Sequence, residues 1–179
     1  MDSKIASFIR EQEGRKLHSY LDTTGVWTIG DGSTMYQTGI MVGKGETITD
    51  AQADAIRDWE IANKSKVITN LLNGLVLTDN QMVALISFTY QEGVGGLQSS
   101  TLLKVIKKNP NSTAIILIAD VPDKSVKDWM VKNNWPSVNE ITMWFMVWNK
   151  VKNPITKIKE FSEAVLQRRL RESKMYFSA

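Results

Sequence analysis

The chain has 179 residues, 42% hydrophobic and 23% charged, which is typical of a globular enzyme with a sizeable core. Its net charge of +3 and isoelectric point of about 9.0 favour encounters with anionic polymers, without choosing among wall glycans, acidic lipids and nucleic acid. The absence of cysteine excludes a disulfide framework and thiolate metal sites. We expect neither a metal nor a cofactor.

Two segments bear on targeting. Residues 1–4 are not a basic stretch followed by an apolar run, so we expect no signal peptide. The longest aliphatic block, residues 115–118, is far shorter than a membrane span, so we expect no transmembrane segment.

The N-terminal part predicts a helix followed by a small sheet. In residues 2–12, Ile5, Phe8 and Ile9 recur at helical spacing, and Gly14 then offers a stop. Glu13 is therefore expected at the C-terminal end of this helix. Residues 16–48 carry β-branched and aromatic strand signals separated by glycines, which favours short antiparallel strands over helices.

Two capping-box signatures predict the next helices. Thr49 opens a helix over residues 50–72, and Thr78 opens a buried helix that should end near Gly93. Further helices are expected at 101–108 and around 112–119, 124–132 and 138–148. The apolar run from Trp144 to Trp148 is expected to pack in the core, with sugar stacking as the alternative.

The last predicted helix, roughly residues 156–177, is basic, because residues 150–174 carry eight Lys/Arg and three Glu. Strands gathered near the N-terminus and helices elsewhere indicate an α+β fold. We expect one domain over residues 1–179. It would comprise a β-rich lobe (13–49), a linking helix (50–72) and a helical lobe (73–179) on which helix 2–12 packs.

Three residues of the N-terminal part form a candidate catalytic group. Glu13, Asp22 and Thr28 would be brought into one cleft by a helix end, a turn and a hairpin. Two carboxylates can split a glycosidic bond, because one protonates the leaving oxygen while the other activates water or stabilises the developing cation.

This pattern, Glu13, Asp22 and Thr28 followed by Ile-Gly-x-Gly, resembles the phage-type lysozymes, or endolysins, of glycoside hydrolase family 24. Other similar segments are the Gly-Glu-Thr-Ile-Thr of 45–49, residues 88–97 and 99–103, and the Arg-Arg-x-x-Glu within 164–172. The resemblance covers residues 5–108 well and 157–177 moderately. It implies a lysozyme-like fold, with the small sheet lobe joined by the long helix to the helical lobe.

The resemblance also implies an activity. The enzyme would be a muramidase that cleaves the bond between N-acetylmuramic acid and N-acetylglucosamine in peptidoglycan, with inversion. Glu13 would be the general acid, and Asp22 the base or the stabilising carboxylate. Thr28 would help to position the water.

Four further residues are candidate substrate contacts. Tyr90 and Gln91 match positions that line the glycan cleft in the family, although both could be ordinary helix positions. Asp31 and Ser33 lie beside the catalytic group, where the family often has an apolar residue and a histidine. Asp31 could instead form a turn. The family motif assigns no role to His18, which we expect to be structural or exposed.

Two alternative functions stay open: a catalytically inert wall-binding module of the same fold, and a glycosidase acting on a chitin-like polymer. The basic C-terminal helix could touch an anionic membrane surface, although core packing is the simpler role. No nucleic-acid motif is present, so we expect no nucleic-acid partner. We expect a monomer that accumulates in the host bacterial cytoplasm and is then released to the wall.

Overall fold

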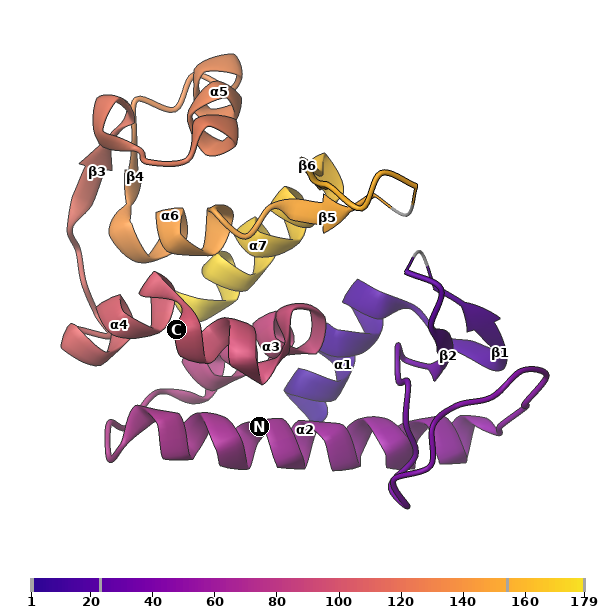
Figure 1. Cartoon of the computed structure of the whole chain (residues 1–179). Coiled ribbons are helices and arrows are strands. Elements are labelled where there is room, and N and C mark those ends of the chain that lie inside the picture. The colour runs from indigo at the N-terminus through magenta and orange to yellow at the C-terminus, as the bar shows by residue number, and fades with distance from the viewer. Residues whose placement is uncertain (1, 23, 154, 179) are drawn as a thin grey trace.

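The chain is organised along one long helix, α2 (Asp50–Leu72), which runs down one side of the molecule (Figure 1). The computed structural model describes residues 2–22, 24–153 and 155–178. A small sheet lies at the N-terminal end of α2, and later helices pack over its remaining length (Figure 1). The predicted α+β arrangement, with a small sheet beside one long helix and helices elsewhere, is confirmed (Figure 1).

The sheet lobe begins with α1 (Asp2–Glu13), followed by β1 (Lys16–Leu21) and β2 (Trp27–Gly30). The two strands pair antiparallel, with Tyr20 opposite Thr28. These elements agree with the predicted helix and hairpin. A small apolar cluster, which joins the sheet lobe to α2, is formed by Ile29, Val42, Ile48, Ala53 and Ile56.

Both predicted capping boxes are present, at the starts of α2 and of α3 (Asp79–Ser99). The predicted helix end near Gly93 falls at a break between two helical segments of α3. Gly93 leaves the helical region (φ 72°, ψ 163°), but the helix resumes and continues to Ser99, so this glycine marks a kink. The next helix, α4 (Thr101–Lys108), has its predicted bounds.

The segment between α4 and the C-terminal hairpin departs most from the prediction. The expected helix at 112–119 is wrong, because β3 (Ile115–Leu117) pairs antiparallel with β4 (Ser137–Asn139), and a 3-10 turn, η1 (Ile118–Asp120), follows β3. This pairing joins segments about twenty residues apart, beyond the reach of local periodicity. α5 (Lys124–Lys132) has its predicted bounds, whereas α6 (Glu140–Met146) is shorter than expected.

The predicted helix 156–177 begins too early. β5 (Lys150–Lys152) and β6 (Lys159–Phe161) pair antiparallel as a hairpin, and α7 (Glu163–Tyr176) starts only afterwards. The side chain of Asn153 accepts the backbone N–H groups of Ile155 and Thr156, which favours a turn over a helix. Ser162 caps α7 by accepting the N–H of Val165.

The main core lies between α1, α2, α3, α4, α6 and α7, where Phe88 and Phe145 pack edge to face with ring centroids 5.9 Å apart. A second apolar cluster around Met130 and Leu166 fills the space between α5, α6 and α7. Within the described residues, no helix has the length and apolar character needed to cross a membrane.

Candidate active site

A cavity of about 580 Å³ lies between the sheet lobe and the helical lobe, and we call it the catalytic cleft. On the sheet side it is lined by the end of α1 and the start of the β1–β2 turn. On the opposite side lie the middle of α3, the β5–β6 hairpin and α7. Its lining residues are Gln12, Glu13, Asp22, Thr24, Gln91, Glu92, Lys150, Val151, Lys152, Lys159, Ala164, Val165, Arg168 and Arg171.

Glu13 is the last residue of α1, and its half-buried carboxylate enters the catalytic cleft. Arg168 on α7 donates to Glu13 Oε1 across 2.6 Å. The other oxygen lies beside Gly32, since a Cβ added at that glycine would be 3.4 Å from Glu13 Oε2. Gly32 also has φ +94°, so a larger residue there would be strained and would press on the carboxylate.

Asp22 follows β1 and lines the same cleft. Its Oδ1 accepts the backbone N–H groups of Thr24 and Val26, each at 2.8 Å, and the Thr24 hydroxyl contacts both carboxylate oxygens. Partial burial alone would raise the pKa of Asp22, but these hydrogen bonds outweigh burial and lower that pKa. Asp22 is therefore ionised at neutral pH.

Thr28 lies on β2, directly across the strand pair from Tyr20. Its side chain is 3% exposed and donates to the backbone carbonyl of Val26 at 3.1 Å. Tyr20 was not singled out from the sequence. Burial, followed by the charges of Glu13 and Asp22, raises the pKa of its phenol.

The structure separates the two predicted contacts on α3. Gln91 lines the catalytic cleft, where its Oε1 accepts a hydrogen bond from Arg169 at 2.9 Å. Tyr90 does not line the cleft. It turns to α2, where its hydroxyl donates to the carbonyl of Arg57 at 3.2 Å and the Lys64 ammonium lies 4.3 Å from its ring centroid.

Asp31 and Ser33 are enclosed by protein, and neither lines the catalytic cleft. Asp31 is 1% exposed, and its oxygens accept hydrogen bonds from Arg15 at 2.8 and 2.7 Å and from Arg57 at 3.4 Å. Ser33 is 2% exposed and exchanges two backbone hydrogen bonds with Ile29. The expectation that both contact substrate is therefore corrected, because neither side chain is accessible. His18 is exposed and hydrogen-bonded to Thr47, outside the cleft.

Behind the cleft lies a buried group that we call the arginine cluster: Ser87, Arg168, Arg169 and Glu172. Glu172 Oε1 accepts the Ser87 hydroxyl at 2.8 Å and Arg168 Nε at 3.1 Å. Arg169 pairs with Glu172 as well: its Nη2 donates to Oε1 at 3.2 Å, and its Nε lies 3.1 Å from Oε2. Arg168 and Arg169 lie four and three residues before Glu172, a helical spacing that allows both pairs, whereas the contact of Arg168 with Glu13 has no local signal.

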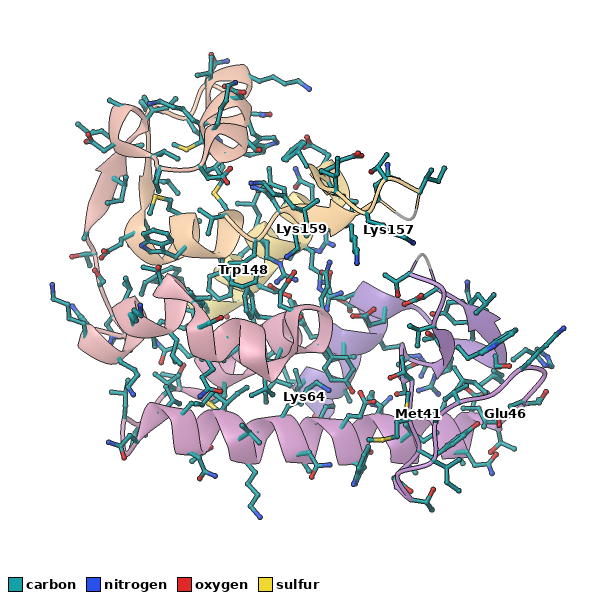
Figure 2. All side chains as sticks on the ribbon, viewed as in Figure 1. Met41, Glu46, Lys64, Trp148, Lys157 and Lys159 are labelled. Atoms are coloured by element: carbon teal, nitrogen blue, oxygen red, sulfur yellow. The ribbon has the colours of Figure 1, made fainter. Side chains whose placement is uncertain are left out.

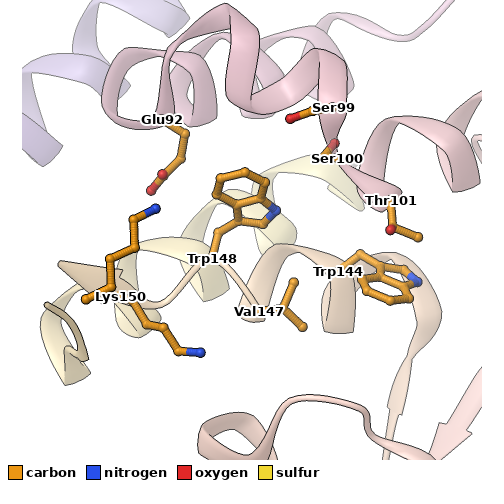
Figure 3. A pocket seen from close by; sticks show the side chains of 9 residues that line it. Glu92, Ser99, Ser100, Thr101, Trp144, Val147, Trp148 and Lys150 are labelled. Atoms are coloured by element: carbon orange, nitrogen blue, oxygen red, sulfur yellow. The ribbon is translucent and has the colours of Figure 1, made fainter. Parts of the chain in front are cut away.

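A second cavity of about 340 Å³, which we call the tryptophan pocket, adjoins the catalytic cleft (Figure 3). Trp144 and Trp148 both line it and are half-buried. Trp148 also packs edge to face on Phe88, with ring centroids 5.4 Å apart. The same tryptophan therefore contacts the core and lines the pocket. The two cavities share Glu92, Lys150 and Lys159.

Two carboxylates in one cleft, between a small sheet and a helical lobe, define a lysozyme-like hydrolase. The sequence profile described as Phage lysozyme matches residues 10–119, which is more than half of the chain. This protein therefore belongs to the phage lysozyme family.

Individual relatives agree. The chain is 35% identical over 109 residues to an endolysin of Acyrthosiphon pisum secondary endosymbiont phage 1, covering 59% of this chain and 68% of that protein. It is 30% identical over 107 residues to the endolysin of Salmonella phage P22, covering 59% and 73%. The solved endolysin from Escherichia coli O157:H7 phage FAHEc1 superposes with a TM-score of 0.73 at 24% identity, covering 97% and 90%.

Family membership makes this protein a glycoside hydrolase of the lysozyme type, and peptidoglycan is its substrate class. The prediction of an enzyme is thereby confirmed. Among the described residues, no group of His, Asp or Glu side chains is arranged to hold a metal ion.

Proposed function

We propose that this enzyme cleaves the glycosidic bond between N-acetylmuramic acid and N-acetylglucosamine, with Glu13 as general acid and Asp22 as its partner carboxylate. The observation that carries the proposal is that Glu13 and Asp22, from different elements, line the same cavity of about 580 Å³. A cleft of that size accommodates a segment of a glycan strand.

The surroundings of Glu13 support its role by fixing its position. Arg168 holds Oε1, while Gly32 closes one side of Oε2. A carboxyl group fixed in this way can present one oxygen to the leaving group with little loss of rotamer entropy during the reaction. Protonation of the glycosidic oxygen makes the sugar a better leaving group.

Asp22 is suited to the second role because hydrogen bonds keep it ionised. A carboxylate can accept a proton from the attacking water, or stabilise positive charge that develops on the sugar ring. We also propose that Thr28 orients water, although it is 3% exposed and does not line the cleft. Its hydroxyl hydrogen is directed to Val26, so its oxygen lone pairs remain to accept a hydrogen bond from a water molecule.

Substitution of the acid tests the proposal. We expect Glu13→Gln to reduce release of reducing ends from purified peptidoglycan by about 100-fold or more, because an amide cannot donate the proton to the leaving oxygen. Mass spectrometry of the wild-type products should show N-acetylmuramic acid at the new reducing ends. Cleavage of a chitin oligomer, with no muropeptide product, would assign the chitin-like activity instead.

Glu11→Gln is the matched control, because Glu11 is an exposed glutamate on the same helix and does not line the cleft. We expect this variant to keep wild-type activity. Equal rates for Glu13→Gln and Glu11→Gln, with both proteins folded by circular dichroism, would contradict the assignment of Glu13.

A further inference from the structure

The β5–β6 hairpin places lysines in the catalytic cleft, opposite the sheet lobe. Lys150, Lys152 and Lys159 all line the cavity that holds Glu13 and Asp22. Figure 2 shows Lys157 and Lys159 on this hairpin, which projects from the helical lobe (Figure 1). None of the three lysines belongs to the catalytic group.

The register of the hairpin brings two of these charges together. Lys152 is the cross-strand partner of Lys159, and Lys150 lies two residues away on the same face. Directly opposed side chains on paired strands lie close together, and like charges in that position destabilise the pair. The hairpin therefore carries a concentration of positive charge that its own fold does not require.

The surrounding acids offset only part of this charge. Lys159 acts on Glu92, whose pKa is raised by burial and lowered by the charges of Arg169 and Lys159. Lys150 pairs with Asp123 at 3.1 Å, but within the part of the chain that the structure describes, neither Lys152 nor Lys159 forms an ion pair. Glu13 is paired with Arg168, and the carboxylate of Glu92 lies 3.8 Å from Arg169. An anion entering the cleft could therefore contact Lys152 and Lys159 directly.

We propose that Lys152 and Lys159 bind free carboxylates of the peptide stems on the peptidoglycan strand, and so give the enzyme a preference for walls whose stems are anionic. This inference rests on the proposed function, because the strand must occupy the cleft for its stems to reach the hairpin. Peptide stems carry carboxylates, and ammonium groups bind carboxylates through charge-assisted hydrogen bonds.

The position of the lysines favours wall carboxylates over a lipid surface. They line a concave cavity together with the two catalytic carboxylates, whereas contact with a bilayer needs a protruding surface. Two exposed apolar residues of the hairpin, Ile155 and Ile158, do not line the cleft, whereas the exposed Val151 does line it, between Lys150 and Lys152.

The test compares two substrates made from one peptidoglycan sample. One retains free stem carboxylates, and the other has them converted to amides with carbodiimide and ammonia. We expect wild-type kcat/KM to be about fivefold higher on the free-carboxylate wall, since each partly exposed ion pair contributes modestly. For the Lys152→Gln/Lys159→Gln double variant, we expect the ratio of the two rates to fall towards one.

The control removes the same charge elsewhere. Lys66 on α2 and Lys132 on α5 are exposed and line neither the catalytic cleft nor the tryptophan pocket. The double variant Lys66→Gln/Lys132→Gln should keep the wild-type ratio. A second readout is the thermal midpoint, which should not fall in the hairpin variant, because a like-charge pair is removed.

The inference is overturned if the hairpin variant keeps the wild-type ratio of kcat/KM on the free-carboxylate wall to kcat/KM on the amidated wall. It is also overturned if this ratio falls equally in both double variants, since net charge alone would then explain the effect. Loss of binding to phosphatidylglycerol vesicles with an unchanged ratio would also overturn it, and would assign the lysines to a lipid surface. If the wild-type enzyme releases no muramic reducing ends from either wall, the proposed function fails instead.

Discussion

At the scale of single residues, the site depends on how the two carboxylates are held. Glu13 is fixed by one arginine and one glycine, whereas Asp22 is surrounded by hydrogen-bond donors from the turn that follows it. Glu13 is thus held by a charged group and Asp22 by neutral hydrogen-bond donors. Different surroundings suit two carboxylates that have different roles in one reaction.

Removal of one donor to Asp22 should shift the pH dependence of activity. Thr24→Val removes the hydroxyl that contacts both Asp22 oxygens, while the Thr24 backbone N–H remains. Because the lowered pKa keeps Asp22 ionised into acidic solution, loss of this donor should raise that pKa. The acidic limb of the kcat/KM profile should then move to higher pH.

The profile is measured from initial rates on peptidoglycan between acidic and neutral pH. Thr38→Val is the control, because Thr38 is an exposed threonine of the same lobe that does not line the cleft. An acidic limb that stays in place, or moves to lower pH, in Thr24→Val would show that the hydroxyl does not hold Asp22 ionised.

At the scale of elements, a group of ion pairs joins the sheet lobe to α2. Asp31 follows β2 and is shared by Arg15 and by Arg57 of α2, and both arginines also contact Asp54. These contacts fix the loop that carries Gly32 against the helix. Asp31 therefore acts on the site through the position of this loop, without touching the cleft.

Neutralising Asp31 should destabilise the fold. In Asp31→Asn the two arginines lose a fully buried carboxylate, and we expect the free energy of unfolding to fall by about 3 kcal/mol in urea titrations. Asp58→Asn is the control. Asp58 also pairs with Arg57 but is exposed, so its loss should cost at most about 1 kcal/mol.

Activity separates a structural Asp31 from a substrate contact. Below the unfolding transition, the KM of Asp31→Asn for peptidoglycan should stay near the wild-type value. A raised KM with unchanged stability would instead restore Asp31 as a residue that touches substrate.

At the scale of the whole molecule, α7 holds the two sides of the site together. Through the arginine cluster it contacts α3 at Ser87, and through Arg168 it reaches Glu13 at the end of α1. One face of this helix is buried against the protein. Contact with an anionic membrane stays a prediction, and any such contact would involve surfaces other than that buried face.

Glu172 is the carboxylate on which the arginine cluster depends. Glu172→Gln should lower the free energy of unfolding by about 3 to 5 kcal/mol, because two buried guanidinium groups lose their shared counter-charge. Thermal unfolding followed by circular dichroism measures the effect. Lys174→Gln, at an exposed position on the same helix, should unfold like the wild type, and equal midpoints for both variants would contradict the prediction.

Local signals in the sequence predicted the helices that begin with a capping side chain or show a clear helical periodicity. The capping boxes at Thr49 and Thr78 placed the starts of α2 and α3, and helical periodicity placed α1. Where pairing is non-local the prediction failed, as in residues 112–119, since β3 is stabilised by β4 rather than by its neighbours in sequence. The β5–β6 hairpin was missed although its pairing is local, because the Asn153 side chain favours a turn where a helix was expected.

The sequence by itself determined the family resemblance and the candidate catalytic residues Glu13, Asp22 and Thr28, because a family motif is a matter of residue type and spacing. Only the tertiary structure decided their surroundings. It joined Arg168 to Glu13 across 155 positions, buried Asp31 under two arginines and brought the hairpin lysines to the cleft. These contacts depend on how distant elements pack, and no local pattern encodes that packing.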